Sequence, residues 1–100
     1  MNKYYSYKEV LVALNEGKRA TRDWWLKEGK FIFQQVPATI GEEIIPKMQS
    51  LPQSVKDEFI KRGGSISYKN QFAMVYSDNT IEGWVARPAD ELTDDWIIFD

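Results

Sequence analysis

The sequence predicts an α+β fold, in which an N-terminal helix packs on a mostly antiparallel β-sheet. Three observations lead to this prediction. One amphipathic helix pattern stands at the start of the chain, strand-like segments dominate the rest of it, and no strand–helix–strand alternation indicates a parallel sheet. The chain has 100 residues. This is too few for a second core, so we expect a single domain over residues 1–100.

The first helix is indicated by its cap and by its apolar spacing. Ser6 and Glu9 form a capping-box pattern, in which each side chain binds the backbone N–H of the other residue. Gly17 is placed to end the helix. The stripe expected to be buried, at the i, i+3, i+4, i+7 spacing of one helix face, is Tyr7, Val10, Leu11 and Leu14.

Short apolar or alternating segments come next, as is typical of strands. Residues 26–30 indicate a hairpin loop, and Ser77, Asp78 and Asn79 favour a turn. The segment 31–36 carries apolar groups on both faces, which predicts a central strand or a strand at an interface. The predicted strands cover residues 19–25, 31–36, 65–68, 71–76, 80–85 and 96–99.

The middle of the chain interrupts the strand pattern with prolines and glycines. Residues 50–53 are typical of a helix start with proline in the first turn. We therefore expect a small helical insertion near residues 43–63. A further helical turn is predicted at residues 87–92, because Pro88 stands near its start.

The composition excludes several kinds of chemistry. A net charge of -2 and a pI near 5.2 leave no surplus of cations for nucleic-acid phosphates. The absence of Cys and His removes disulfides, thiol and Ser-His-Asp catalysis, and metal sites built on imidazole or sulfur. No apolar run approaches the roughly 18 residues of a membrane span, and the N-terminus is too polar for a signal peptide. We expect a cytoplasmic protein without a metal or cofactor.

Two clusters of residues are candidates for function. The first is the segment 18–25, where cations stand beside Trp24 and Trp25. Guanidinium groups bind phosphate oxygens and an indole stacks on a base, so Arg22 and Trp25 are typical of a nucleotide site. In the alternative interpretation one indole lies in the core, the other covers the sheet edge, and the cations face solvent.

The second cluster lies near the C-terminus and combines Trp84 and Arg87 with three aspartates, Asp90, Asp94 and Asp95. Paired carboxylates serve acid–base catalysis or hold a divalent cation. Aspartates before a strand are also ordinary turn residues. In a third interpretation, Asp90 accepts hydrogen bonds from ribose hydroxyls or a base amino group.

The order of several features along the chain points to a family. These features are a helix ending in Gly17-Lys18, Arg22 followed by Trp25, the strand 31–33 leading into Val36-Pro37, Trp84, Asp90 and Asp95-Trp96. In this order they resemble the Thoeris anti-defense 2-like domain of small phage and prophage proteins. The central residues 45–68 look like a longer insertion found in one branch of that family.

The resemblance implies a molecular sponge that counteracts bacterial defence. Such proteins bind the glycocyclic ADP-ribose signal that a TIR-domain enzyme makes from NAD, and they hold it without cleaving it. Members form homotetramers with pockets at subunit contacts, and some also bind cyclic dinucleotides. The family's binding residues fall on Arg22, Trp25, Trp84 and Asp90 of this chain. Trp24 stands where the family commonly has Gly.

These observations lead to one expected function and two alternatives. We expect a non-enzymatic binder of a cyclic nucleotide-type signal in the bacterial cytoplasm. Trp25 and Trp84 would be its stacking or wall residues, Arg22 and Arg87 would bind phosphates, and Asp90 would bind a ribose or base. Arg87 stands where the family commonly has Ser. The first alternative is a phage or prophage protein–protein interaction module without a nucleotide ligand. The second is a hydrolase that uses Asp90 with a neighbouring aspartate.

Overall fold

The computed structural model describes residues 3–99, which fall into two compact units. One unit, here called the body, contains the chain up to Gln35 and again from Gln71 onward. The other, here called the insertion, is Val36–Asn70. The single domain expected over residues 1–100 stays a prediction.

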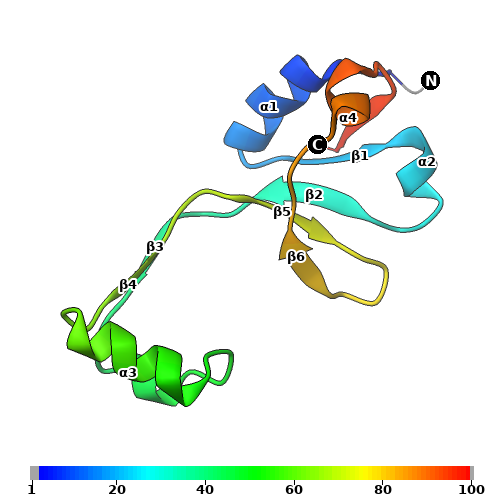
Figure 1. The fold of residues 1–100 in the computed structure, drawn as a ribbon. Coiled ribbons are helices and arrows are strands. Elements are labelled where there is room, and N and C mark those ends of the chain that lie inside the picture. The colour runs from blue at the N-terminus through cyan, green and yellow to red at the C-terminus, as the bar shows by residue number, and fades with distance from the viewer. Residues whose placement is uncertain (1–2, 100) are drawn as a thin grey trace. The chain divides into compact units, whose positions relative to one another are not determined.

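The body is an antiparallel sheet with helices, which confirms the predicted α+β class (Figure 1). Its five strands are in the order β6-β5-β2-β1-β7, and every neighbouring pair is antiparallel. Strand β2 is therefore central, as its two apolar faces predict. The elements of the body are α1 Tyr7–Asn15, β1 Arg19–Arg22, α2 Asp23–Leu26, β2 Phe31–Gln34, β5 Phe72–Val75, β6 Ile81–Gly83, α4 Pro88–Leu92 and β7 Trp96–Phe99.

Helix α1 forms as its cap predicts. The Glu9 backbone N–H donates to Ser6 Oγ over 3.3 Å, and the Ser6 N–H donates to Glu9 Oε1 over 3.1 Å. The helix ends before Gly17, which adopts a φ of 90°. Its buried face, which packs against β1 and β7, includes Val10 and Leu14, whereas Leu11 is exposed, contrary to the predicted stripe. Leu11 lies at the margin of that face.

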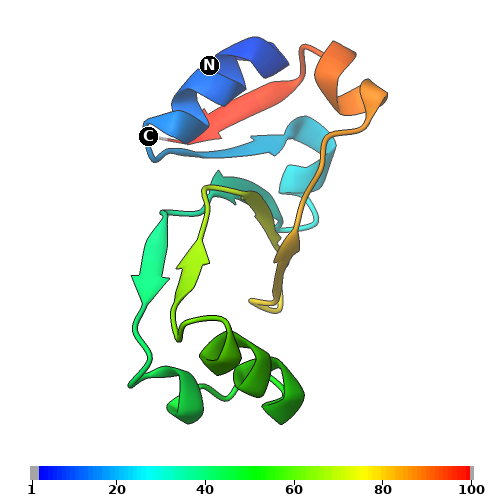
Figure 2. The ribbon, with the colours of Figure 1, turned by 60° about the vertical axis from the view of Figure 1, so that its left-hand side comes forward.

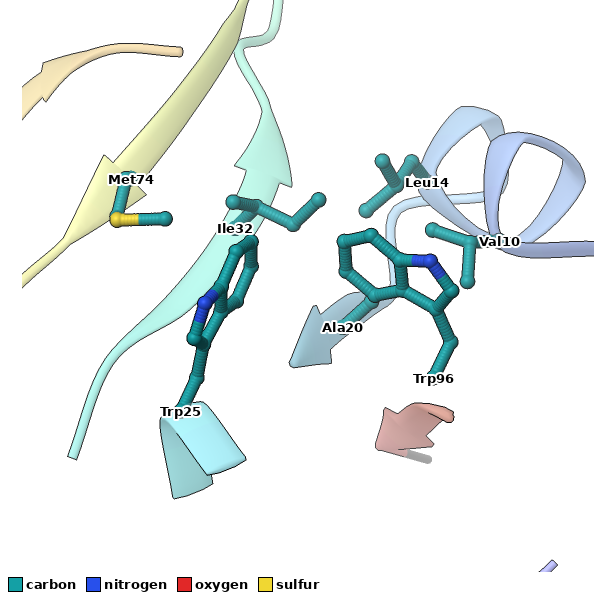
Figure 3. Packing of buried hydrophobic residues seen from close by; sticks show 7 residues of the cluster. All are labelled: Val10, Leu14, Ala20, Trp25, Ile32, Met74 and Trp96. Atoms are coloured by element: carbon teal, nitrogen blue, oxygen red, sulfur yellow. The ribbon is translucent and has the colours of Figure 1, made fainter. Parts of the chain in front are cut away.

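The core of the body is built around two tryptophans (Figure 3). The ring centroids of Trp25 and Trp96 lie 5.2 Å apart at an interplanar angle of 87°, an edge-to-face arrangement. Ile32 of the central strand lies beside both rings and is fully buried (Figure 3). Val10 and Leu14 pack on the same cluster from α1.

The strand predicted at 19–25 ends early, at Arg22. The Asp23 backbone N–H donates to the Asp95 carbonyl over 3.1 Å, and the chain then turns into the single helical turn α2. The turn carries Trp25 inward and leaves Trp24 half exposed. Alternation along the sequence cannot detect this change, because a four-residue helix is too short to show a period.

The insertion contains a two-stranded antiparallel sheet and two short helices. In Figure 2 its strands β3 and β4 run side by side and lead to η1 and α3. The helical insertion is thus confirmed, but the unit extends beyond residues 43–63, and the strand before it was not predicted. Three residues between Pro37 and Gly41 give no detectable alternation. The elements are β3 Ala38–Ile40, η1 Ile45–Lys47, α3 Gln53–Lys61 and β4 Ile66–Tyr68.

Within residues 3–99, none of the helices has the length and apolar character needed to cross a membrane.

Candidate functional site

All five residues predicted to bind a ligand line one cavity in the body. The cavity has a volume of about 530 Å³, within the range of small-molecule sites. The fold thus brings together the two clusters that are far apart in the sequence. The predicted residues are Arg22, Trp25, Trp84, Arg87 and Asp90, and the other lining residues are Trp24, Lys30, Met74, Tyr76, Glu82, Gly83, Val85 and Ala89.

One wall of the cavity is a face of the β5–β6 pair. Met74 lies directly opposite Glu82 in the antiparallel register, so both side chains point to the same face of the sheet. Side chains two residues apart share a face, which adds Tyr76 and Trp84 to this wall. The remaining lining residues come from the end of β1, from α2, from the residue before β2, from β6 and the segment that follows it, and from α4.

Arg22 is held by two carboxylates. Its Nε and Nη2 donate to Asp95 Oδ1 and Oδ2 over 2.9 and 3.2 Å, and its Nη1 donates to Asp90 Oδ1 over 3.0 Å. The hydrogen bonds with Arg22 hold the pKa of the Asp95 carboxyl below its ordinary value, and they raise the pKa of Arg22. Arg22 therefore joins the end of β1 to the segment that contains α4 and β7.

Asp90 lines the cavity and also stabilises the fold through its hydrogen bonds. It is 6% exposed, and its second oxygen accepts the Arg87 backbone N–H over 2.9 Å at the start of α4. The Asp90 backbone carbonyl accepts the indole N–H of Trp96 over 2.8 Å. Both carboxylate oxygens thus already have protein donors.

The indoles of the cavity differ in what they can offer a ligand. Trp25 is 3% exposed, and its ring packs edge-to-face with Trp84 as well as Trp96. Its ring is too little exposed to stack on a base, so Trp25 serves as part of the cavity wall. Trp24, which sequence reasoning did not select, is 49% exposed and lines the cavity. Its accessible ring is the better stacking surface.

The cations of the cavity also differ. Arg87 is exposed, and its guanidinium forms no ion pair within residues 3–99. Lys30 Nζ lies 5.0 Å from the Trp24 ring centroid and 3.2 Å from Glu28 Oε1. Since two carboxylates already bind Arg22, we consider Arg87 and Lys30 the cations more available to an anionic ligand.

Tyr76 and Glu82 are further lining residues that were not predicted. The Tyr76 hydroxyl donates a short hydrogen bond to Glu82 Oε1, and this bond raises the pKa of Tyr76. Their positions two residues from Met74 and Trp84 place them on the cavity face. The two-residue spacing is visible in the sequence, and it would have predicted both residues once the strand pairing was known.

The aspartates do not gather as a metal site. In the part of the chain that the structure describes, no group of three or more potential metal-ligating side chains occurs. Asp90 and Asp95 face Arg22 instead, and Asp94 is exposed outside the cavity. Asp90 and Asp95 together hold the Arg22 side chain, and we call these three residues the Arg22 clamp.

Fold and site together define a small α+β domain whose sheet carries a cavity of indoles, cations and carboxylates. Comparison with known families then identifies the family. The chain belongs to the Thoeris anti-defense 2-like domain family, whose model matches residues 5–99. The resemblance seen in the sequence is thereby confirmed, and with it an anti-defence role. A search of curated proteins found no match.

Proposed function

We propose that this protein binds and sequesters a cyclic nucleotide-type immune signal, glycocyclic ADP-ribose or a cyclic dinucleotide, and releases it unchanged. One observation carries the proposal. The five residues selected from the sequence line one cavity together with the exposed indole of Trp24, and one of the five, Arg87, has no ion pair among the described residues. Membership in an anti-defence family also supports this proposal.

The lining residues supply the contacts that such a ligand needs. Trp24 stacks on a base, a contact of roughly 1 to 3 kcal/mol. Arg87 and Lys30 bind phosphate oxygens through charge-assisted hydrogen bonds of roughly 1.5 to 3 kcal/mol each. Nanomolar affinity needs about 12 kcal/mol. These three contacts together supply roughly 4 to 9 kcal/mol before the cost of association is subtracted, so nanomolar affinity requires further contacts with the cavity walls.

Binding without conversion fits the state of the carboxylates. Asp90 and Asp95 are engaged by Arg22, and the lowered pKa of Asp95 favours its ionised form. An ionised carboxylate bound to a guanidinium is a poor general acid, and the engaged oxygens are poor bases. This supports a binder over a hydrolase that uses Asp90 with Asp95.

We include self-association into a homotetramer in the proposal, as the family resemblance implies. The edge strand β6 and the residues after it expose apolar side chains beside the cavity, with Ile81 at 61% and Val85 at 86% exposure. Covering such side chains in an assembly is favourable. Sedimentation of the purified protein measures the oligomeric state.

The test is titration of the purified protein with glycocyclic ADP-ribose and a panel of cyclic dinucleotides, followed by heat release and chromatography. The expected result is tight binding and recovery of intact ligand. Recovery of a cleaved product would indicate a hydrolase. Absence of binding at micromolar concentration would favour the protein–protein interaction module.

Variants locate the site in the same titration. Trp24→Ala and Arg87→Gln are expected to weaken binding about tenfold or more each, because each removes one stacking or charged contact. Arg62→Gln, which removes an exposed arginine of the insertion, is the matched control. Arg22→Ala is a poor probe of ligand contact, because it leaves buried Asp90 without its cation.

A further inference from the structure

Glu82 is the carboxylate of the cavity that is not committed to a cation. Within residues 3–99 the Glu82 side chain forms no ion pair. Its one hydrogen bond there is the bond that Oε1 accepts from the Tyr76 hydroxyl. The other acidic lining residue, Asp90, has both oxygens engaged. Glu82 therefore keeps an oxygen, Oε2, that can accept a hydrogen bond from a ligand.

The strand pairing holds this acceptor on the cavity face. Glu82 lies opposite Met74, whose side chain belongs to the buried core. Trp84, two residues further along, borders the same cavity. The Tyr76 hydroxyl, on the residue that follows β5, donates to Glu82 Oε1 and so orients the carboxylate.

The chemistry of a lone carboxylate restricts what it binds. It repels phosphate, so the ligand's anionic part belongs beside Arg87 and Lys30. It accepts hydrogen bonds and donates none, so it is complementary to the amino group of a base and opposed to a carbonyl oxygen at that position. Adenine carries an amino group at C6, and hypoxanthine carries an oxygen there.

We propose that Glu82, oriented by Tyr76, is a specificity-determining residue that selects a nucleotide whose base has an exocyclic amino group. This inference rests on the proposed function and adds the class of base to it. It assigns the base end of the ligand to the β5–β6 wall, with the ring stacked on Trp24.

The experiment measures dissociation constants for two probes, glycocyclic ADP-ribose and its analogue with hypoxanthine in place of adenine. The wild-type protein is expected to bind the adenine probe about tenfold or more tightly, the effect of one charge-assisted hydrogen bond. In Glu82→Gln the ratio is expected to fall to about one or below, because the amide also donates to a carbonyl oxygen. Glu91→Gln, which removes an exposed carboxylate outside the cavity, is expected to keep the wild-type ratio.

Each other outcome overturns a defined part of the proposal. A wild-type protein that binds both probes equally, or a Glu82→Gln variant that keeps the preference, overturns the role of Glu82 and leaves the proposed function standing. A wild-type protein that binds neither probe, nor any cyclic dinucleotide, overturns both. Tryptophan fluorescence during urea unfolding verifies that the variants remain folded.

Discussion

The body and the insertion each contain an arginine–carboxylate pair of nearly the same length in very different surroundings. In the body, Arg22 Nη1 lies 3.0 Å from Asp90 Oδ1, and the two side chains are 12% and 9% exposed. In the insertion, Arg62 Nε lies 2.8 Å from Glu58 Oε2, with exposures of 73% and 50%. Water screens the second pair and hardly reaches the first, so distance alone does not rank them.

The same contrast extends to the apolar side chains. The body buries two tryptophans against α1 and the sheet. In the insertion, no residue of α3 is buried, although the structure describes all nine of its residues. Its buried apolar side chains are Ile45 and Ile66. We infer that the body supplies the rigid frame of the cavity and that the insertion depends on few contacts of its own.

Removing the central indole of the body is expected to have the largest effect. Trp96→Ala leaves a large cavity and removes the donor to the Asp90 carbonyl, so we expect a loss of about 3 to 5 kcal/mol in the free energy of unfolding. Urea unfolding measures it. Trp24→Ala, at a half-exposed position, is the control and is expected to change this energy little. Equal losses would contradict the assignment of Trp96 to the core.

A smaller and local effect is expected from Ile45→Ala, which truncates a fully buried residue of the insertion. The loss of about 2 to 4 kcal/mol should appear as faster amide hydrogen exchange in β3 and β4. All four tryptophans lie in the body, so tryptophan fluorescence reports on the body alone. We expect its unfolding midpoint to remain unchanged. A shifted midpoint would mean that both units unfold as one cooperative domain.

Acid is expected to weaken the body through the Arg22 clamp. The lowered pKa of Asp95 means that the unfolded chain takes up a proton first, so stability is complete above the ordinary aspartate value of 3.8 and is lost as the pH falls below it. Asp78, whose pKa is also lowered, adds to this trend. Urea unfolding between pH 7 and pH 2.5, roughly the range of these groups, measures the loss.

Two variants isolate the contribution of Asp95 to the acid effect. Asp95→Asn is expected to show a shallower loss of stability with acid than the wild-type protein, and Asp94→Asn, at an exposed neighbour, is expected to follow the wild-type curve. Parallel curves for all three proteins would contradict a stabilising role of the Asp95 carboxylate.

The smallest effect is expected at the exposed pair of α3. Glu58→Gln removes the charge partner of Arg62 and is expected to cost less than about 0.5 kcal/mol, as is usual for screened pairs on a helix surface. Hydrogen exchange of the α3 amides measures it. A loss of about 3 kcal/mol or more, which is usual when a buried pair is broken, would overturn the contrast between the two regions.

Local signals in the sequence predicted most of the elements of this fold. The capping box at Ser6, the central position of β2 and the helix in the insertion all depend on neighbouring residues. The turn α2 and the strand β3 were missed because neither is long enough to show a period. For the same reason the predicted strand 19–25 ran past its true end at Arg22.

The sequence by itself determined the α+β class, the family and five of the residues that line the cavity. Only the tertiary structure decided the exposure and the partners of each lining residue. In the tertiary structure Trp25 is buried and Trp24 is exposed. Arg22 forms ion pairs with Asp90 and Asp95, and Glu82 Oε2 can still accept a hydrogen bond from a ligand. The physical reason is that burial and ion pairing depend on partners far away along the chain, and strand pairing and close packing select those partners.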